Sequence, residues 1–137
     1  MIYILSISNT SYDYEDLEDM VVMASSTIDK VLEYADTKIP IRNLDSYEIF
    51  VNEDGGLRHE EIYLDSDAYD RFARYPSDMF SENEDEYKYV CCKLRAWCDA
   101  LKEKKRKLKE EAEQKERERK EKQERELYEK LKAKYGD

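Results

Sequence analysis

Glycine, proline, histidine and cysteine are all scarce in this chain, and each scarcity excludes a class of protein. The 137 residues include 3 Gly, 2 Pro, 1 His and 3 Cys. So few glycines and prolines exclude collagen-like chains and disordered chains rich in these residues. Three glycines, of which Gly55 and Gly56 are adjacent in a predicted turn, cannot form a phosphate-binding P-loop. No run of ~18 apolar residues is present, so the sequence predicts no transmembrane helix.

The single histidine and the three cysteines give little support to metal or nucleophilic chemistry. Cys91, Cys92 and Cys98 form no C-x-x-C pair, and the two adjacent cysteines point to different faces of a helix. His59 lies in a predicted strand, where the simplest interpretation is an exposed structural residue, and not in an H-E-x-x-H helix. We therefore expect no metal, no cofactor and no catalytic residue, and hence a protein that is not an enzyme.

The start of the chain does not resemble an export signal. Residues 1–5, MIYIL, lack a basic segment and a small-residue cleavage site. An odd number of cysteines with no sign of export indicates a reducing compartment. We expect a cytoplasmic protein with no membrane segment.

Acidic residues outnumber basic residues, and the excess lies in one part of the chain. There are 34 Asp and Glu against 24 Lys and Arg, which gives a net charge of −10. Residues 1–85 carry 21 acidic and 6 basic side chains, whereas residues 86–137 carry 13 acidic and 18 basic ones. An acidic segment repels nucleic acid, because nucleic acid is bound through Lys and Arg, and it attracts a basic protein surface. The plainer interpretation of the same charge is solubility alone.

The apolar patterns predict an α+β fold. A small antiparallel sheet of about four strands, with one packed helix, precedes a long C-terminal helix whose distal half is a charged, solvent-exposed rod. Strands are predicted at 1–8, 20–24, 46–51 and 57–64, the first of them central and the third with alternating burial, with a tight turn at 52–56. A short helical turn, capped by Asp65 or Ser66, is predicted to extend to Phe72.

The packed helix has the spacing of an amphipathic helix. Ile28, Val31, Leu32 and Ala35 follow the i, i+3, i+4, i+7 rule for a face that packs on the sheet. Ser26 is its predicted N-cap, with an acidic residue three positions later. The helix should end before Pro40, because the residue before a proline disfavours helical backbone.

The second half of the chain predicts one long helix that starts at a capping box in residues 81–84. Its first part has an apolar stripe at helical spacing, which should cover the sheet: Tyr87, Val90, Cys91, Leu94, Trp97, Cys98 and Leu101. From 102 to 126 apolar residues nearly vanish and opposite charges lie four apart, a pattern that stabilises isolated helices. The predicted domains are an acidic head at 1–80 and a helix at 81–137, divided into a packed part (81–101), a rod (102–126) and a small apolar patch (127–135).

The numerous carboxylates form no specific motif. Asp65, Asp67 and Asp70 have part of the spacing of a calcium loop but lack its central Gly and its final Glu. Helix capping by Asp65 explains the cluster more simply. Acid–base catalysis needs one carboxyl group held in an apolar pocket, and no residue is singled out for that role.

Tyrosine is abundant, and its distribution predicts protein recognition. There are 12 tyrosines, a residue type enriched at protein interfaces. Two of them lie in an acidic loop where no core requires them. The predicted partner-binding residues are Tyr12, Asp13, Tyr14, Glu15, Asp16, Glu18, Asp19, Tyr69 and Tyr75. Helix-mediated contacts are predicted at Leu127, Tyr128, Leu131 and Tyr135.

The first half of the chain resembles small bacteriophage-encoded proteins of uncharacterised function. Three short segments carry the resemblance: the Ser-Tyr-Asp-Tyr loop at 11–14, the Ser-Ser segment and helix at 25–34, and the strand Glu-Ile-Tyr-Leu-Asp at 61–65. It covers roughly residues 1–66. The resemblance implies a phage accessory protein that binds a host protein, and hence one that acts in the cytoplasm of the host cell.

Three hypotheses follow from these observations. The first is a non-enzymatic phage-type protein that inhibits or redirects a host protein by docking its acidic head on a basic, nucleic-acid-binding surface, as an anti-defence or anti-CRISPR inhibitor would. The second is an adaptor that links a host protease or polymerase component to a second partner through the C-terminal helix. The third is a structural protein that self-associates as a homodimer through that helix. None of them involves direct binding of nucleic acid.

Overall fold

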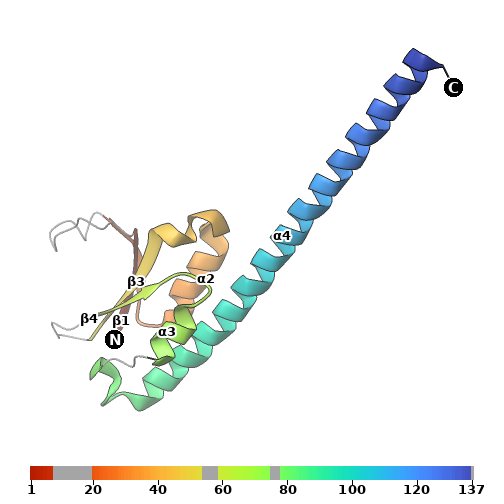
Figure 1. The fold of residues 1–137 in the computed structure, drawn as a ribbon. Coiled ribbons are helices and arrows are strands. Elements are labelled where there is room, and N and C mark those ends of the chain that lie inside the picture. Colours follow the sequence, from red (N-terminus) through yellow and green to blue (C-terminus); the bar gives the residue numbers. More distant parts are fainter. Residues whose placement is uncertain (8–19, 54–58, 75–77, 137) are drawn as a thin grey trace. The chain divides into compact units, whose positions relative to one another are not determined.

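The computed structural model describes residues 1–7, 20–53, 59–74 and 78–136. The chain divides into two compact units, Met1–Leu101 (unit 1) and Lys102–Asp137 (unit 2). Unit 1 contains a four-stranded antiparallel sheet and the helices that pack on it, and the described part of unit 2 is almost wholly helical (Figure 1). This arrangement confirms the predicted α+β class and the long C-terminal helix.

The sheet has the strand order β2-β1-β3-β4. Its strands are β1 (Ile2–Ile7), β2 (Val21–Ser25), β3 (Tyr47–Asn52) and β4 (His59–Tyr63). The first strand is central, as predicted, and pairs antiparallel with β2 on one side and β3 on the other. The register places Tyr3 opposite Val51 and Leu5 opposite Ile49. Because side chains alternate along a strand, these four buried residues share one face of the sheet.

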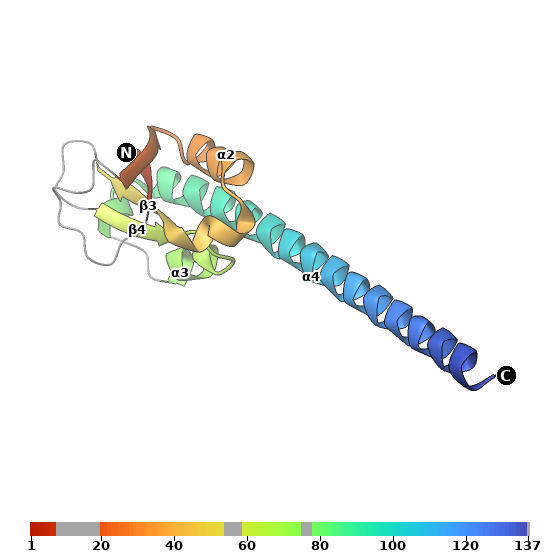
Figure 2. The same cartoon turned by 90° about the horizontal axis from the view of Figure 1, so that it is seen from above.

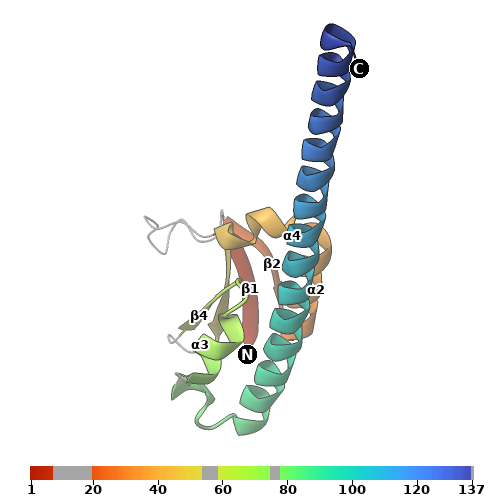
Figure 3. The ribbon, with the colours of Figure 1, turned by 45° about the vertical axis from the view of Figure 1, so that its right-hand side comes forward.

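Helices α2 (Ile28–Lys38) and α4 (Glu84–Tyr135) lie side by side on that face, where residues 84–101 are the part of α4 that belongs to unit 1 (Figures 2 and 3). All four apolar residues predicted for the buried face of α2 are buried: Ile28, Val31, Leu32 and Ala35. The predicted stripe of α4 is confirmed as well, since Val90, Leu94, Cys98 and Leu101 are buried and the other three members pack against the core. The short helix α3 (Ala68–Arg74) adds Phe72 to the same core.

Both predicted helix caps are wrong. The N-cap of α2 is Thr27, not Ser26, and its side chain makes no capping bond. The Thr27 backbone N–H instead donates a hydrogen bond of 3.2 Å to the hydroxyl oxygen of Ser25, at the end of β2. Helix α4 begins at Glu84, not after Ser81, because residues 81 and 82 form a turn. The first bond of α4 runs from the Tyr87 N–H to the Asn83 carbonyl at 3.0 Å.

Two further differences concern the segment from 41 to 52. Residues Ile41–Ser46 form a 3-10 helix, η2, which the sequence pattern did not indicate. The alternating burial expected for the third strand is wrong, since four consecutive residues of β3, from 48 to 51, are buried. Glu48 is among them, so β3 is covered on both faces. Most of the predicted turn at 52–56 lies outside the described residues.

In unit 2, residues 102–135 continue as helix and are almost entirely exposed. Ion pairs lie along its surface at spacings of three and four residues, for example between Arg119 and Glu116 at 2.5 Å. Among the residues described, no helix combines the length and the apolar character that crossing a bilayer requires.

Candidate protein-binding groove

An acidic stripe runs along the side of α2 that borders α4. Asp29, Glu33 and Asp36 are spaced i, i+4 and i+7, so they lie in one line along the helix. Asp29 is half-buried, and the other two carboxylates are exposed. The stripe therefore offers three carboxylates at intervals of one helical turn.

Helix α4 presents a matching line of residues to this stripe. Lys93, Trp97 and Ala100 have the same i, i+4, i+7 spacing. Together with Leu32 and the acidic stripe, they line an open groove of about 280 Å³, which we call the α2–α4 groove. Trp97 is the only tryptophan of the chain and is half-buried. The groove thus combines an acidic rim with one large aromatic surface.

One end of the groove is fixed by a cluster of three side chains. The Tyr89 hydroxyl donates a hydrogen bond to Asp29 Oδ2. Lys93 Nζ lies 3.6 Å from Asp29 Oδ1 and 5.5 Å from the centre of the Tyr89 ring. This cluster offsets the charge of Asp29. The lining of the groove nevertheless stays acidic, because it contains three carboxylates and one lysine.

The groove rests on rigid elements. Leu32 at its base is buried, as are Val31 and Leu94 on the core sides of the two helices. Residues whose positions are fixed by core packing hold a binding surface more precisely than residues on loops. The carboxylates and the indole are therefore held close together before any partner arrives.

This arrangement can recognise a cationic side chain. The face of a Trp ring attracts Lys or Arg groups, more strongly than Tyr or Phe does. Carboxylates form charge-assisted hydrogen bonds with the same groups, and bidentate ones with Arg. A Lys or Arg from a partner would lie over Trp97 with its charge near Glu33 and Asp36.

A second hollow lies at the edge of the sheet but already contains a cation. Seven residues of β4 and α3 line about 190 Å³, and Arg71 is one of them. Its guanidinium group lies 2.9 Å from Asp65, donates to the Tyr63 carbonyl at 3.2 Å and lies 5.7 Å from the centre of the Tyr63 ring. The Tyr63 hydroxyl donates to Glu61 at 3.2 Å, a bond that raises the pKa of Tyr63. The polar groups of this hollow therefore bind one another.

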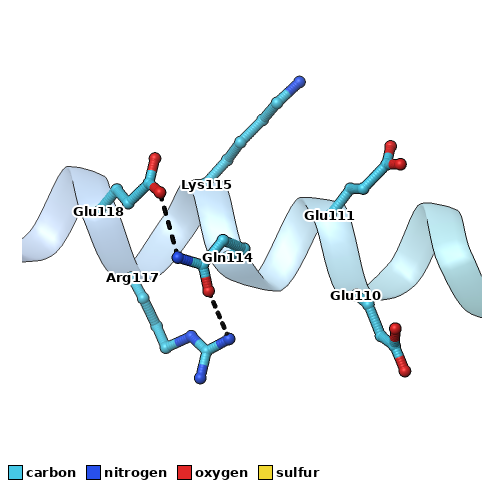
Figure 4. A pocket seen from close by; sticks show the side chains of 6 residues that line it. All are labelled: Glu110, Glu111, Gln114, Lys115, Arg117 and Glu118. Carbon is cyan, nitrogen blue, oxygen red and sulfur yellow. Dashed lines mark hydrogen bonds between the residues drawn. The ribbon is translucent and has the colours of Figure 1, made fainter.

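A third hollow lies on unit 2 and is formed by one helix alone. Its lining residues project from successive turns of α4 (Figure 4): Glu110, Glu111, Gln114, Lys115, Arg117 and Glu118. The Gln114 amide donates to Glu118 at 3.1 Å and accepts from Arg117 at 2.8 Å. A row of side chains on one convex helix encloses no ligand. Within the described residues, no cluster of three or more His, Cys, Asp or Glu side chains could hold a metal ion.

The structure describes only some of the residues predicted to bind a partner. Residues 12–19 and Tyr75 lie outside the described part of the chain. Tyr69 is half-buried, with its ring centre 5.9 Å from the Arg95 guanidinium, and its backbone N–H donates to Cys98 Sγ at 3.4 Å. Tyr69 therefore also has a structural role between α3 and α4.

The four residues predicted for helix-mediated contacts lie on one side of α4 in unit 2. We call them the tail patch, and their exposed fractions are 58% for Leu127, 66% for Tyr128, 46% for Leu131 and 72% for Tyr135. Nothing in the described residues of unit 2 covers them. Large apolar side chains grouped in this way mark a binding surface more often than single exposed ones do.

Sequence reasoning missed the α2–α4 groove. It treated Asp29 as a helix-start residue and Trp97 as a member of the stripe that covers the sheet. The i, i+4, i+7 spacing of the acidic stripe was a signal that could have been found, but its position beside Trp97 depends on helix packing. No protein-family model, curated protein or solved structure matches the chain, so its function is inferred from the geometry and charge of this groove.

Proposed function

We propose that this chain is a non-enzymatic binding protein whose unit 1 docks on a basic surface of another protein. The α2–α4 groove receives a Lys or Arg side chain of that surface. The observation that carries the proposal is the acidic stripe of α2 beside Trp97, the one tryptophan of the chain. A half-buried indole bordered by carboxylates offers a cation both an aromatic ring and opposite charge.

The charge of unit 1 supports the same partner. Residues 1–101 contain 23 acidic and 9 basic residues, a formal charge of −14. Such a unit accelerates its encounter with a basic surface and disfavours acidic ones. The most extended basic surfaces of proteins are those that bind nucleic acid. The mechanism would be competition with nucleic acid for that surface, as in the first of the three hypotheses drawn from the sequence.

The proposal is tested by comparing two variants with the same change in charge. The groove variant is Glu33→Lys with Asp36→Lys, and the control variant is Asp45→Lys with Glu82→Lys, both exposed positions outside the groove. Each protein is immobilised, and a bacterial lysate is passed over it at low and at high salt. Binding led by charge should weaken steeply between ~50 and ~500 mM salt.

The expected result is a dominant nucleic-acid-binding protein that the wild type and the control variant retain at low salt and the groove variant loses. The purified target should then shift the emission of Trp97 in the wild type. Equal retention by all three proteins would contradict a role for the groove. Retention that high salt does not reduce would contradict docking through charge.

A second candidate function, the adaptor, is favoured by the tail patch. Its four exposed apolar residues lie in unit 2, a separate compact unit from the one that holds the groove. A chain truncated after Lys122 lacks the tail patch and keeps the groove. If the chain is an adaptor, this truncation should lose one partner and keep the target of unit 1. If it keeps every partner, the tail patch has no adaptor role.

A further inference from the structure

We infer that the tail patch of one molecule docks in the α2–α4 groove of a second copy of the chain. The occupant of the groove, before a target is met, is then the lysine-bordered end of α4 from a neighbouring molecule. This inference rests on the cation-binding groove of the proposed function and adds a competitor for it. It is carried by the shape and charge of two surfaces that the structure describes.

The first observation is the pattern of side chains in the tail patch. An α-helix turns about 100° per residue, so residues 127, 128, 131 and 135 fall within about 100° of its circumference. Lys130 and Lys134 lie on one border of this apolar stripe and Lys132 on the other, while Glu129 is on the opposite side. Such an amphipathic segment is suited to a groove with an apolar floor and an acidic rim.

The second observation is that the α2–α4 groove has these properties. Its floor includes Leu32 and Trp97, and its rim is the acidic stripe. Glu33 and Asp36 are three residues apart, and Lys130 and Lys134 are four residues apart. The two pairs are therefore spaced by about 4.5 and about 6 Å along their helices. Two lysines of the tail can face two carboxylates of the stripe while the apolar residues meet the indole.

The third observation is the charge of the two units. Unit 1 has a formal charge of −14, whereas residues 102–137 hold 15 basic and 11 acidic residues and carry +4. Contact between two copies of unit 1, or between two copies of unit 2, brings like charges together. Contact between unit 1 of one molecule and unit 2 of another brings opposite charges together. Charge thus favours a head-to-tail contact over a symmetric one.

The same argument disfavours pairing of two copies along unit 2. Residues 102–109 contain six basic residues and one acidic residue. A parallel pair of helices would place this basic segment beside itself. An antiparallel pair would place it beside residues 127–135, which contain three lysines and one glutamate. Like charges meet in both arrangements, which costs stability.

The test uses full-length protein and three variants, studied by sedimentation velocity. The groove variant, Glu33→Lys with Asp36→Lys, keeps the tail patch. The tail variant, Tyr128→Gln with Leu131→Gln, keeps the groove and retains good helix-forming residues. The control variant is Asp45→Lys with Glu82→Lys. Because association obeys mass action, each is followed from about 1 to about 200 µM at low salt.

We expect the average mass of the wild type and of the control variant to rise with concentration and to pass that of a dimer. A head-to-tail contact leaves a free groove at one end and a free tail at the other, so it does not close. Each of the other two variants alone should remain a monomer. An equal mixture of them should form a dimer and stop there, because it contains one intact groove and one intact tail. Emission from Trp97 of the tail variant should shift on mixing.

A wild type that stays monomeric at the highest concentration would overturn the inference. So would a mixture of the two variants that fails to associate when the wild type does, which would indicate a symmetric contact. The proposed function is judged separately. If the groove is needed to capture a basic target but the wild type is monomeric, the inference fails and the proposed function stands. If the mixture associates but no basic target depends on the groove, the inference stands and the proposed function fails.

Discussion

At the scale of single residues, Tyr3 connects the centre of the sheet to the start of α4. Its side chain is fully buried, and its hydroxyl donates a hydrogen bond to Glu86 Oε1 at 2.5 Å across 83 positions of the sequence. Burial, and then this bond, raise the pKa of Tyr3 above its ordinary value. A hydrogen bond to a charged acceptor in a protected position contributes more than an exposed one does.

Replacing Tyr3 by Phe should destabilise unit 1 by about 1–2 kcal/mol, because the hydrogen bond is lost and Glu86 loses its donor. The free energy of unfolding can be measured in urea by the emission of Trp97. The matched control is Tyr47→Phe, since Tyr47 is half-buried on the neighbouring strand. We expect the control to change stability by less than about 0.5 kcal/mol. An equal decrease in the free energy of unfolding in the two variants would mean that the hydrogen bond to Glu86 does not stabilise unit 1.

The same pair of proteins gives a prediction for alkaline pH. In the unfolded chain Tyr3 loses its proton near 10.0, whereas in the folded chain its pKa is raised. The contribution of Tyr3 to stability is therefore complete below pH 10 and falls as the pH rises above that value. The difference in unfolding free energy between the wild type and Tyr3→Phe should shrink above pH 10. A constant difference up to pH 11 would contradict the raised pKa.

Two leucines of α4 should respond differently to the same substitution. Leu94 is fully buried in the core of unit 1, whereas Leu108 is 50% exposed in unit 2. Leu94→Ala removes packed methyl groups and should cost about 2–5 kcal/mol. Leu108→Ala should change the stability of unit 1 by less than about 0.5 kcal/mol. Urea unfolding followed by Trp97 emission measures both, and a large loss at Leu108 would show that unit 2 supports the fold of unit 1.

At the scale of elements, α4 is stabilised differently in its two parts. Residues 84–101 belong to the core of unit 1, while residues 102–135 have ion pairs and almost no burial. Arg106 illustrates the second case, since it bonds to Glu103 at 2.5 and 3.0 Å and also to Glu110. The bond from Arg106 lowers the pKa of Glu103. Exposed pairs of this kind each contribute little, so we expect this part of the helix to melt over a broader range of temperature than the packed core of unit 1 does.

Thermal unfolding should therefore give different curves with two probes. Circular dichroism at 222 nm reports helix in both units, whereas the emission of Trp97 reports unit 1 alone. We expect a broad loss of helix over a wide range of temperature and one sharp transition in fluorescence. Coincident curves from the two probes would show that the units unfold as one.

The helices and strands also show which features of the fold could be predicted from the sequence. The apolar face of α2, the stripe of α4 and the central place of β1 could be predicted because each depends on periodicity within one segment. The N-cap of α2 could not be predicted, because the hydrogen bond between Thr27 and Ser25 moves the start of the helix by one residue. The burial of Glu48 and Phe50 could not be predicted either, because it depends on the segments that cover both faces of β3. The tail patch could be predicted from the sequence, because its four apolar residues lie within a helix that is otherwise charged.

At the scale of the whole molecule, charge is divided unequally between the two units. The α2–α4 groove was invisible to sequence reasoning because Glu33 and Trp97 are 64 positions apart and meet only when two helices pack. The acidity of the first part of the chain was visible at once. That acidity is the basis for the proposed basic partner, and the α2–α4 groove is the place on unit 1 where we propose that it binds.

The distance in sequence between contacting residues has a consequence for the speed of folding. Strand β1 pairs with β3, and Tyr3 bonds to Glu86, so unit 1 forms only after distant segments meet. The helix of residues 102–135 needs only local bonds and forms within about a microsecond. After dilution from urea, part of the ellipticity should return within the dead time of mixing, and Trp97 emission should recover later in a resolvable phase. Early in refolding, the helix of residues 102–135 has therefore formed while the sheet of unit 1 has not. The tail patch is then present before the α2–α4 groove that would bind it.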